Sequence, residues 1–294
     1  MSRRKLEMAW IVARQYKNWP SVIFHLALRR PMKVVKLRGG RTISSHRPID
    51  INCYLYLSIL LNAGWEVVEI DDKLILLRDR GGVEVKCRYT RGYDLGHLVE
   101  IFIDKCYGDH FAEQNVIDVG ASNGDSALYF AMMGAKRVVG FEPYLESYSL
   151  ALENIKKNGF SDVVSLSNTA LAPARGNLEL KISSKSPNVN SSSPTSYIRS
   201  LYTFDEGNVV EAIVLDDVVR NFGSDQIDLL KMDCEGCEYG VLNSVSPNTL
   251  RRIKEIRIEF HDGSSTISQL LIENGFAVHC EGGLTGYIHA IRDY

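Results

Sequence analysis

A glycine-containing turn with acidic neighbours is the first stretch of the sequence that could do chemistry. It reads Asp118-Val119-Gly120-Ala121-Ser122-Asn123-Gly124-Asp125 and lies between an expected strand and an expected helix. Gly120 permits a tight turn, and Gly124 permits close approach of the backbone to a ligand. The amides that open a helix can bind a polar or anionic group. The turn therefore indicates a nucleotide-binding loop.

A second acid, Glu142, ends the next expected strand. A carboxylate about twenty residues after such a turn accepts hydrogen bonds from both hydroxyls of a ribose. A dinucleotide fold expects three glycines, the middle one admitting a pyrophosphate, whereas here Ser122 lies between Gly120 and Gly124. The carboxylate of Asp118 would repel a pyrophosphate and attract an ammonium or sulfonium. The pattern favours S-adenosylmethionine over NAD.

Groups suited to proton transfer follow two later expected strands, residues 227–232 and 253–260. Methyl transfer from a sulfonium is one displacement, which needs an aligned acceptor oxygen and a base but no metal and no covalent intermediate. Histidine titrates near neutrality and is the expected base; a desolvated carboxylate is the alternative. The candidate catalytic residues at these strand ends are His261, Asp233, Glu235 and Glu259.

Two further readings of this region stay open. A metal-assisted variant would place Mg²⁺ among Asp233, Glu235 and Glu259. The pair Cys234-x-x-Cys237 could be a redox pair or half of a zinc site, but no second pair with ligand spacing exists. The six cysteines are therefore expected to be free thiols in a reducing compartment.

Strands and helices alternate from residue 115 onward, which predicts a parallel sheet covered by helices on both faces. The last elements read as a helix over residues 265–274 followed by a hairpin around Gly282-Gly283. The chain before this region predicts helices over residues 5–30, a short hairpin, a helix over 50–62, three short strands and a last helix. We expect a small α+β region over residues 1–110 and a larger α/β domain over residues 111–294.

Three blocks of the sequence resemble the FkbM-type methyltransferases. They are the turn at residues 118–126, Phe141-Glu142-Pro143, and Asp228-Leu229-Leu230-Lys231-Met232-Asp233-Cys234-Glu235-Gly236-Cys237-Glu238-Tyr239. The resemblance implies an S-adenosylmethionine-dependent O-methyltransferase with the Rossmann-like, seven-stranded class I fold, whose reversed last strand the terminal hairpin would supply. It covers about residues 110–294, and Ser122 departs from the family's usual Gly-Ala-Asn turn.

The resemblance also implies which residues hold the cofactor. Those expected to line the methionine part are Asp118, Gly120, Ala121, Asn123 and Gly124. Glu142 would hold the ribose, Pro143 and Tyr144 would border the adenine, and Asn168 and Thr169 are further candidates for the adenine edge. A sugar or glycan hydroxyl is the acceptor that the family suggests, which is an analogy rather than residue chemistry.

Charge is distributed unevenly along the chain. Residues 1–50 hold twelve Lys/Arg and two Asp/Glu, whereas the whole chain has a net charge of −2. This basic segment docks on the chain's own acidic part, forms a solvated face, or binds an anionic partner, which could be a phospholipid surface, a phosphorylated carrier or a nucleic acid. The near-neutral total argues against a protein whose whole surface binds nucleic acid. Because 45% of residues are hydrophobic, wholesale disorder is excluded.

The expected location is the cytoplasm, with a peripheral membrane contact as one option, since no secretory signal is evident. Two rival functions stay open. An NAD-dependent oxidoreductase predicts the complete three-glycine turn, and a non-enzymatic module would bind an anionic partner through residues 1–50. The sequence predicts neither the oligomeric state nor whether the serine-rich segment 183–196 forms a lid.

Overall fold

The structure is a computed structural model of the 294-residue chain that describes residues 3–90, 93–186 and 189–292. It divides into two compact units, Met1–Cys106 and Tyr107–Tyr294. Each unit is described by itself. None of the helices in the described ranges is long and apolar enough to cross a membrane.

The first unit combines helices with two small antiparallel sheets, as its alternating short apolar runs predict. β1 pairs with β2, and the second sheet has the order β3-β4-β5. Helix α3 begins after Asp50, whose side chain accepts a hydrogen bond from the Asn52 amide, and it ends at the left-handed Gly64. The elements are α1 (Arg3–Gln15), α2 (Trp19–Ala27), β1 (Met32–Lys36), β2 (Thr42–Ile49), α3 (Ile51–Ala63), β3 (Glu66–Ile70), β4 (Leu74–Arg78), β5 (Glu84–Arg88), α4 (Asp94–Leu98) and the π-helix η1 (Val99–Ile103).

The second unit is built on a seven-stranded sheet of order β15-β16-β14-β13-β6-β7-β8. The five strands from β14 to β8 are parallel, and only β16 runs against its neighbours β14 and β15. This is the Rossmann-like class I arrangement with a reversed last strand that the sequence predicted. The strands are β6 (Asn115–Val119), β7 (Arg137–Phe141), β8 (Val164–Ser167), β13 (Ile227–Met232), β14 (Ile253–Phe260), β15 (Phe276–Gly282) and β16 (Gly286–Arg292).

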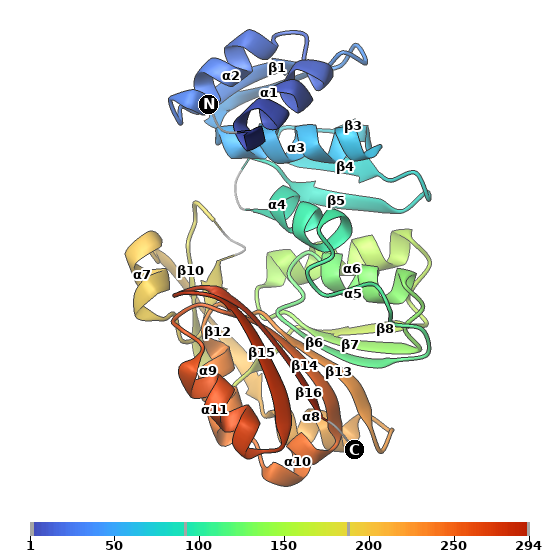
Figure 1. Ribbon diagram of the computed structural model, residues 1–294, viewed down its shortest axis with the longest axis vertical. Helices are drawn as coiled ribbons and strands as arrows, with labels where there is room; N and C mark the ends of the chain where they lie inside the picture. The colour runs from blue at the N-terminus through green and yellow to red at the C-terminus, as the bar shows by residue number, and fades with distance from the viewer. Residues whose placement is uncertain (1–2, 91–92, 187–188, 293–294) are drawn as a thin grey trace. The chain divides into compact units, whose positions relative to one another are not determined.

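Helices cover both faces of this sheet (Figure 1). Helices α5 (Asp125–Met132) and α6 (Leu145–Lys157) pack together on one face. The other face buries the main apolar core, in which side chains of β6, β13 and β14 meet those of the remaining helices. Those helices are α8 (Leu215–Asn221), α9 (Cys237–Ser244), α10 (Pro247–Arg251) and α11 (Ser265–Glu273).

A separate four-stranded sheet is formed by strands that lie between β8 and β13 in the chain. Its two long strands, β10 (Gly176–Ile182) and β12 (Glu206–Ile213), pair antiparallel with each other along seven residues. Two short strands complete it, β9 (Ala170–Leu171) and β11 (Asn190–Ser191), and helix α7 (Ser196–Leu201) follows. The serine-rich segment thus contains a strand, and residues 187–188 lie outside the described residues.

Candidate active site

The glycine turn forms a tight bend at the carboxyl end of β6, because two consecutive amides donate hydrogen bonds to the same carbonyl. The amides of Gly120 and Ala121 both donate to the carbonyl of Phe141 on β7, each at 3.0 Å. Gly120, Ser122 and Gly124 all have positive φ, at 80°, 46° and 82°. The bend thus begins with backbone angles that favour glycine.

Position 120 must be glycine because the backbone at the end of another strand leaves no room for a side chain there. A Cβ atom at Gly120 would lie 1.8 Å from the carbonyl oxygen of Asp233, which directly follows β13. We therefore expect Gly120→Ala to lower the free energy of unfolding by about 3 kcal/mol, from backbone strain and displacement of the neighbouring strand end.

Urea unfolding of Gly120→Ala, with Gly283→Ala as the matched control, measures this effect. A Cβ at Gly283 meets nothing within 4 Å, and its φ lies outside the left-handed region. If Gly120→Ala is as stable as the control, the bend and the end of β13 do not approach as closely as described.

Gly124 has a different role from the one we predicted. A Cβ there would lie 3.0 Å from both Cα and Cβ of Ala151, so this glycine lets helix α6 pack against the start of α5. The predicted close approach at Gly124 is therefore an approach to α6. Asn123 is fully buried, and its carbonyl accepts a hydrogen bond from the Asn154 side chain on the same helix.

Asp118 also differs from the prediction, because its carboxylate is turned into the protein. It has no exposed surface, and Oδ1 lies 3.1 Å from Nζ of Lys231 on β13. Oδ2 accepts a hydrogen bond from the Ser126 hydroxyl at 2.6 Å, and Lys231 Nζ also donates to the Gly120 carbonyl at 2.7 Å. Asp118 therefore holds the bend from beneath, as a positioning residue, and does not face a ligand.

Lys231 is the residue that the sequence analysis missed in this arrangement. Burial alone would lower the pKa of Lys231, but Asp118 and Asp233 raise it above its ordinary value, so the ammonium is retained. The signal was present, since a lysine inside an apolar strand needs a buried partner.

Glu142 lies at the tip of β7 directly beside the bend, where we expected it. Its Oε2 accepts from the Ser122 amide at 2.9 Å and its Oε1 from the Tyr144 amide at 2.8 Å. Asn168 closes the far side by donating to the carbonyls of Glu142 and Pro143, both at 2.9 Å. The structure thus gathers Glu142, Pro143, Tyr144 and Asn168 around one strand end, with Thr169 hydrogen-bonded to Ser167 beside them.

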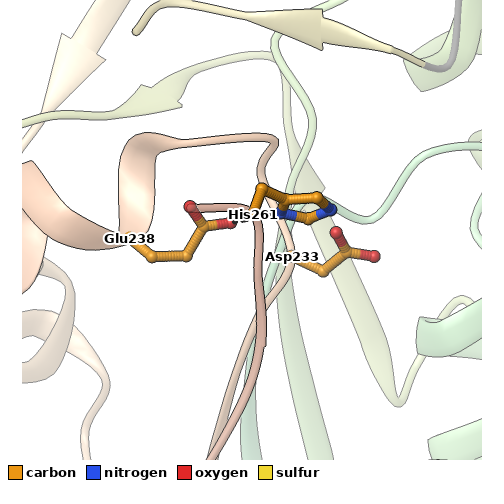
Figure 2. Close-up of side chains that lie close together, drawn as sticks. All are labelled: Asp233, Glu238 and His261. Carbon is orange, nitrogen blue, oxygen red and sulfur yellow. Dashed lines mark ion pairs between the residues drawn. The ribbon is translucent and has the colours of Figure 1, made fainter. Parts of the chain in front are cut away.

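The four candidate catalytic residues also come together, at the ends of β13 and β14. His261 Nε2 lies 3.4 Å from Glu235 Oε2 and 3.8 Å from Glu259 Oε1, while Nδ1 lies 3.9 Å from Glu238 Oε1. Figure 2 shows the imidazole ring with the carboxylate of Glu238 on one side and that of Asp233 on the other. Glu238 is the member of this group that our list of candidates omitted.

This concentration of acids changes the state of the histidine. Burial alone would lower the pKa of His261, but the carboxylates of Glu235, Glu238, Asp233 and Glu259 raise it to about 9. The imidazole is therefore protonated at neutral pH in the unliganded site. The reason for which we expected His261 to be the base, a pKa near neutrality, does not apply to this state.

A tight turn after β13 positions two of the acids. Glu235 and Gly236 have positive φ of 57° and 118°, and Glu238 accepts hydrogen bonds from the amides of Cys234 and Gly236, both at 2.8 Å. The side chain of Glu238 thus binds two amides of this turn. Burial raises the pKa of the Glu238 carboxyl, and His261 opposes that rise.

The same turn joins two cysteines that we expected to be free. Cys234 and Cys237 form a disulfide, since the turn brings their Cα atoms to 5.5 Å. The prediction of free thiols is wrong for this pair. The other four cysteines are thiols, namely Cys53, Cys87, Cys106 and Cys280.

The serine-rich segment contacts this cluster through two hydroxyls. Ser191 donates to the carbonyl of Glu235 at 2.7 Å, and Thr195 donates to the carbonyl of His261 at 2.9 Å. The segment therefore supports both loops that carry the acids and the imidazole.

With this geometry in place, comparison with known proteins decides the family. The model of the methyltransferase FkbM domain matches residues 118–283, which include the bend, Glu142 and the acid–imidazole cluster. The chain belongs to the FkbM methyltransferase family. It is accordingly an S-adenosylmethionine-dependent methyltransferase, as the resemblance of the three sequence blocks implied.

Relatives of this FkbM-family chain carry the same general description. Methyltransferase sdnD of Sordaria araneosa is 28% identical over 209 residues, which are 61% of this chain and 80% of that protein. Methyltransferase 1 of Beauveria bassiana is 27% identical over 200 residues, 62% of this chain and 80% of that protein. The crystal structure of methyltransferase FkbM from Methylobacillus flagellatus aligns with a TM-score of 0.43 at 14% identity. That alignment covers 62% of this chain but only 44% of the other.

The residues around the bend fit S-adenosylmethionine. Glu142 is 3% exposed, and the amides of Ser122 and Tyr144 orient its carboxylate beside the bend; helix α5 starts directly after Gly124. The acids after β13 supply negative charge beside the bend, to which a sulfonium is attracted. Asp118 is no longer among the residues expected to contact the cofactor, because its carboxylate binds Lys231 and Ser126. Ala121 and Asn123 would contact the cofactor through their backbones, since both side chains are buried.

Proposed function

We propose that this methyltransferase transfers the methyl group to a hydroxyl group of a sugar or glycan precursor. The observation that carries the proposal is the gathering of Asp233, Glu235, Glu259 and His261 at two strand ends beside the bend. When bound, S-adenosylmethionine would supply an electrophilic methyl group. The acceptor oxygen would bond to this methyl carbon as the carbon–sulfur bond breaks and leaves its electron pair on sulfur. The family resemblance supports the sugar or glycan part.

In this proposal the chain's own residues position the acceptor and remove its proton. The hydroxyl proton passes to a carboxylate of the cluster, with Glu235 and Glu259 as the candidates, because their side chains are 17% and 26% exposed and can reach an acceptor. His261 holds both carboxylates in place. Such general-base assistance contributes about 100- to 10,000-fold to a rate.

The test is a screen of hydroxyl-bearing acceptors, sugar nucleotides and glycans included, with methyl-labelled S-adenosylmethionine. A product whose label survives mild alkali, and whose methyl group is shown by NMR to be bonded to oxygen, is a methyl ether and supports the proposal. A label released by mild alkali would be a carboxyl ester, and a label found only on amines or carbon would likewise contradict O-methylation.

A second proposal concerns residues 1–50, and it commits to an anionic lipid surface as their partner. We infer this from exposed apolar side chains on α1 and α2 together with the basic balance of this segment. Trp10 and Phe24 are each 56% exposed, and Arg14 lies over the Trp10 ring at 4.5 Å. Aromatic and basic side chains on short helices suit the boundary between lipid headgroups and acyl chains.

We expect the full chain to sediment with vesicles containing phosphatidylserine and not with pure phosphatidylcholine vesicles. The double variant Trp10→Ala with Phe24→Ala should weaken this binding at least tenfold by order of magnitude, since each side chain loses buried apolar area. Val209→Ala, which alters a residue 75% exposed in the other unit, is the control. Equal binding by wild type and the double variant, or binding to single-stranded RNA in place of vesicles, would reject the lipid surface.

A further inference from the structure

Three side chains of the cluster, Asp233, Glu238 and His261, each offer one ligand atom to a common point. These atoms all lie within 4.8 Å of one another. For bonds of about 2.1 Å, one pair of ligands on opposite sides of a cation is about 4.2 Å apart and the other pairs are about 3 Å apart, so side-chain shifts of roughly 1 Å would complete a site. The three residues come from the ends of β13 and β14 and from the first turn of α9.

The imidazole supplies an independent observation that points to a ligand. His261 is 6% exposed, and its Nδ1 has no hydrogen-bond partner among the described residues. A buried polar atom without a partner costs about 1–3 kcal/mol, so such atoms are rare unless something binds them. Glu238 Oε1 lies 3.9 Å from Nδ1, which is too far for a hydrogen bond.

The surroundings of His261 fix which nitrogen faces this point. Nε2 lies on the other side of the ring, near Glu235 and Glu259 at 3.4 and 3.8 Å. A cation that binds at Nδ1 displaces the proton that this nitrogen carries in the unliganded site, while the N–H at Nε2 stays directed to these carboxylates. Pairing of one ring nitrogen with a carboxylate while the other binds a metal is the usual arrangement of metal-binding histidines.

The two carboxylates complement the imidazole in different ways. Glu238 is fully buried and held by two amides, so its carboxylate is oriented in advance and has lone pairs left for a cation. Asp233 is half-buried, and its Oδ2 accepts a long hydrogen bond, 3.5 Å, from the Tyr107 hydroxyl. One imidazole and two carboxylates form a mixed nitrogen and oxygen set suited to Mn²⁺, Fe²⁺ or Zn²⁺.

We propose that Asp233, Glu238 and His261 bind a divalent first-row transition-metal cation. Three protein ligands leave coordination positions open, and the half-buried Asp233 marks the side from which a further ligand enters. If the proposed O-methylation holds, on which this one step rests, the open position accepts the acceptor hydroxyl and lowers its pKa before its proton passes to Glu235 or Glu259. The sequence analysis had expected a reaction without metal, or Mg²⁺ on Asp233, Glu235 and Glu259.

The experiment is a titration of the full chain with Mn²⁺. Binding is measured as the loss of the electron paramagnetic resonance signal of free Mn²⁺. Mn²⁺ favours carboxylate and imidazole over thiol ligands, so the cysteine thiols do not compete. We expect about one Mn²⁺ per chain, and at least tenfold weaker binding by Asp233→Asn and by His261→Gln, by analogy with ligand-shell substitutions. A Zn²⁺ titration by calorimetry should show the same ranking.

The matched control is His289→Gln, because His289 forms another histidine–carboxylate pair in the same sheet, 2.8 Å from Glu255. It should bind Mn²⁺ as the wild type does. Absence of saturable binding of both Mn²⁺ and Zn²⁺, or equal binding by wild type and both ligand variants, would overturn the proposal. S-adenosylmethionine binding is measured in the same samples without metal. A lost metal site is thereby distinguished from a failed methyl-donor assignment or a misfolded variant.

Discussion

Replacing Lys231 by methionine should lower the free energy of unfolding by about 3–5 kcal/mol, because it leaves the buried carboxylate of Asp118 without its counter-ion. The side chains of the two residues are 2% and 0% exposed, and their charged atoms are 3.1 Å apart. Solvent therefore cannot replace the lost partner. The ammonium also donates to the carbonyl of Gly120, so the bend itself should loosen.

Urea unfolding of three variants separates the cost of the unpaired carboxylate from other consequences of removing a lysine. Lys231→Met alone should be the least stable, and adding Asp118→Asn should restore roughly 2 kcal/mol or more, since removing both charges is far less harmful than removing one. Lys254→Met, at an exposed position on β14, should change stability by less than about 0.5 kcal/mol. If the double variant is no more stable than Lys231→Met, the pair does not act as described.

Glu142→Ala should weaken S-adenosylmethionine binding about 100-fold while leaving the chain folded. Two hydrogen bonds from ribose hydroxyls to a carboxylate are worth about 1.5–3 kcal/mol each, part of which is recovered by water. Glu142 also accepts the amides of Ser122 and Tyr144, so a Glu142→Gln variant of the same size separates lost charge from lost shape.

Calorimetry on these variants and on Glu273→Ala, which removes an exposed acid at the end of α11, provides the comparison. We expect Glu142→Gln to fall between wild type and Glu142→Ala, and Glu273→Ala to bind as the wild type does. Unchanged affinity in Glu142→Ala, with an unchanged melting temperature, would remove the ribose role from this residue.

Local patterns predicted most of the elements and the placement of Glu142. Alternating strands and helices after residue 115 specify a parallel sheet, and in such a sheet the ends of neighbouring strands meet at one edge. Glu142 therefore lies beside the bend from chain order alone. Local sequence also predicted the terminal hairpin around Gly282-Gly283, which supplies the antiparallel β16.

The role of Asp118 could not be predicted in the same way, because it depends on a pairing across the sheet. Lys231 lies directly opposite Asp118 in the register of β13 with β6. Without the strand order, the acid seemed free to face a ligand. The expectation that the pKa of His261 lies near neutrality was wrong for a related reason. Its pKa is raised by four carboxylates that the fold brings together from two separate strand ends.

The central claim is that the bend and Glu142 bind S-adenosylmethionine, and calorimetry of the wild-type chain with S-adenosylmethionine and with NAD tests it most directly. We expect saturable binding of S-adenosylmethionine at one site per chain, competed by its demethylated product, and no binding of NAD at the same concentrations. Saturable binding of NAD, with none of S-adenosylmethionine, would contradict the account.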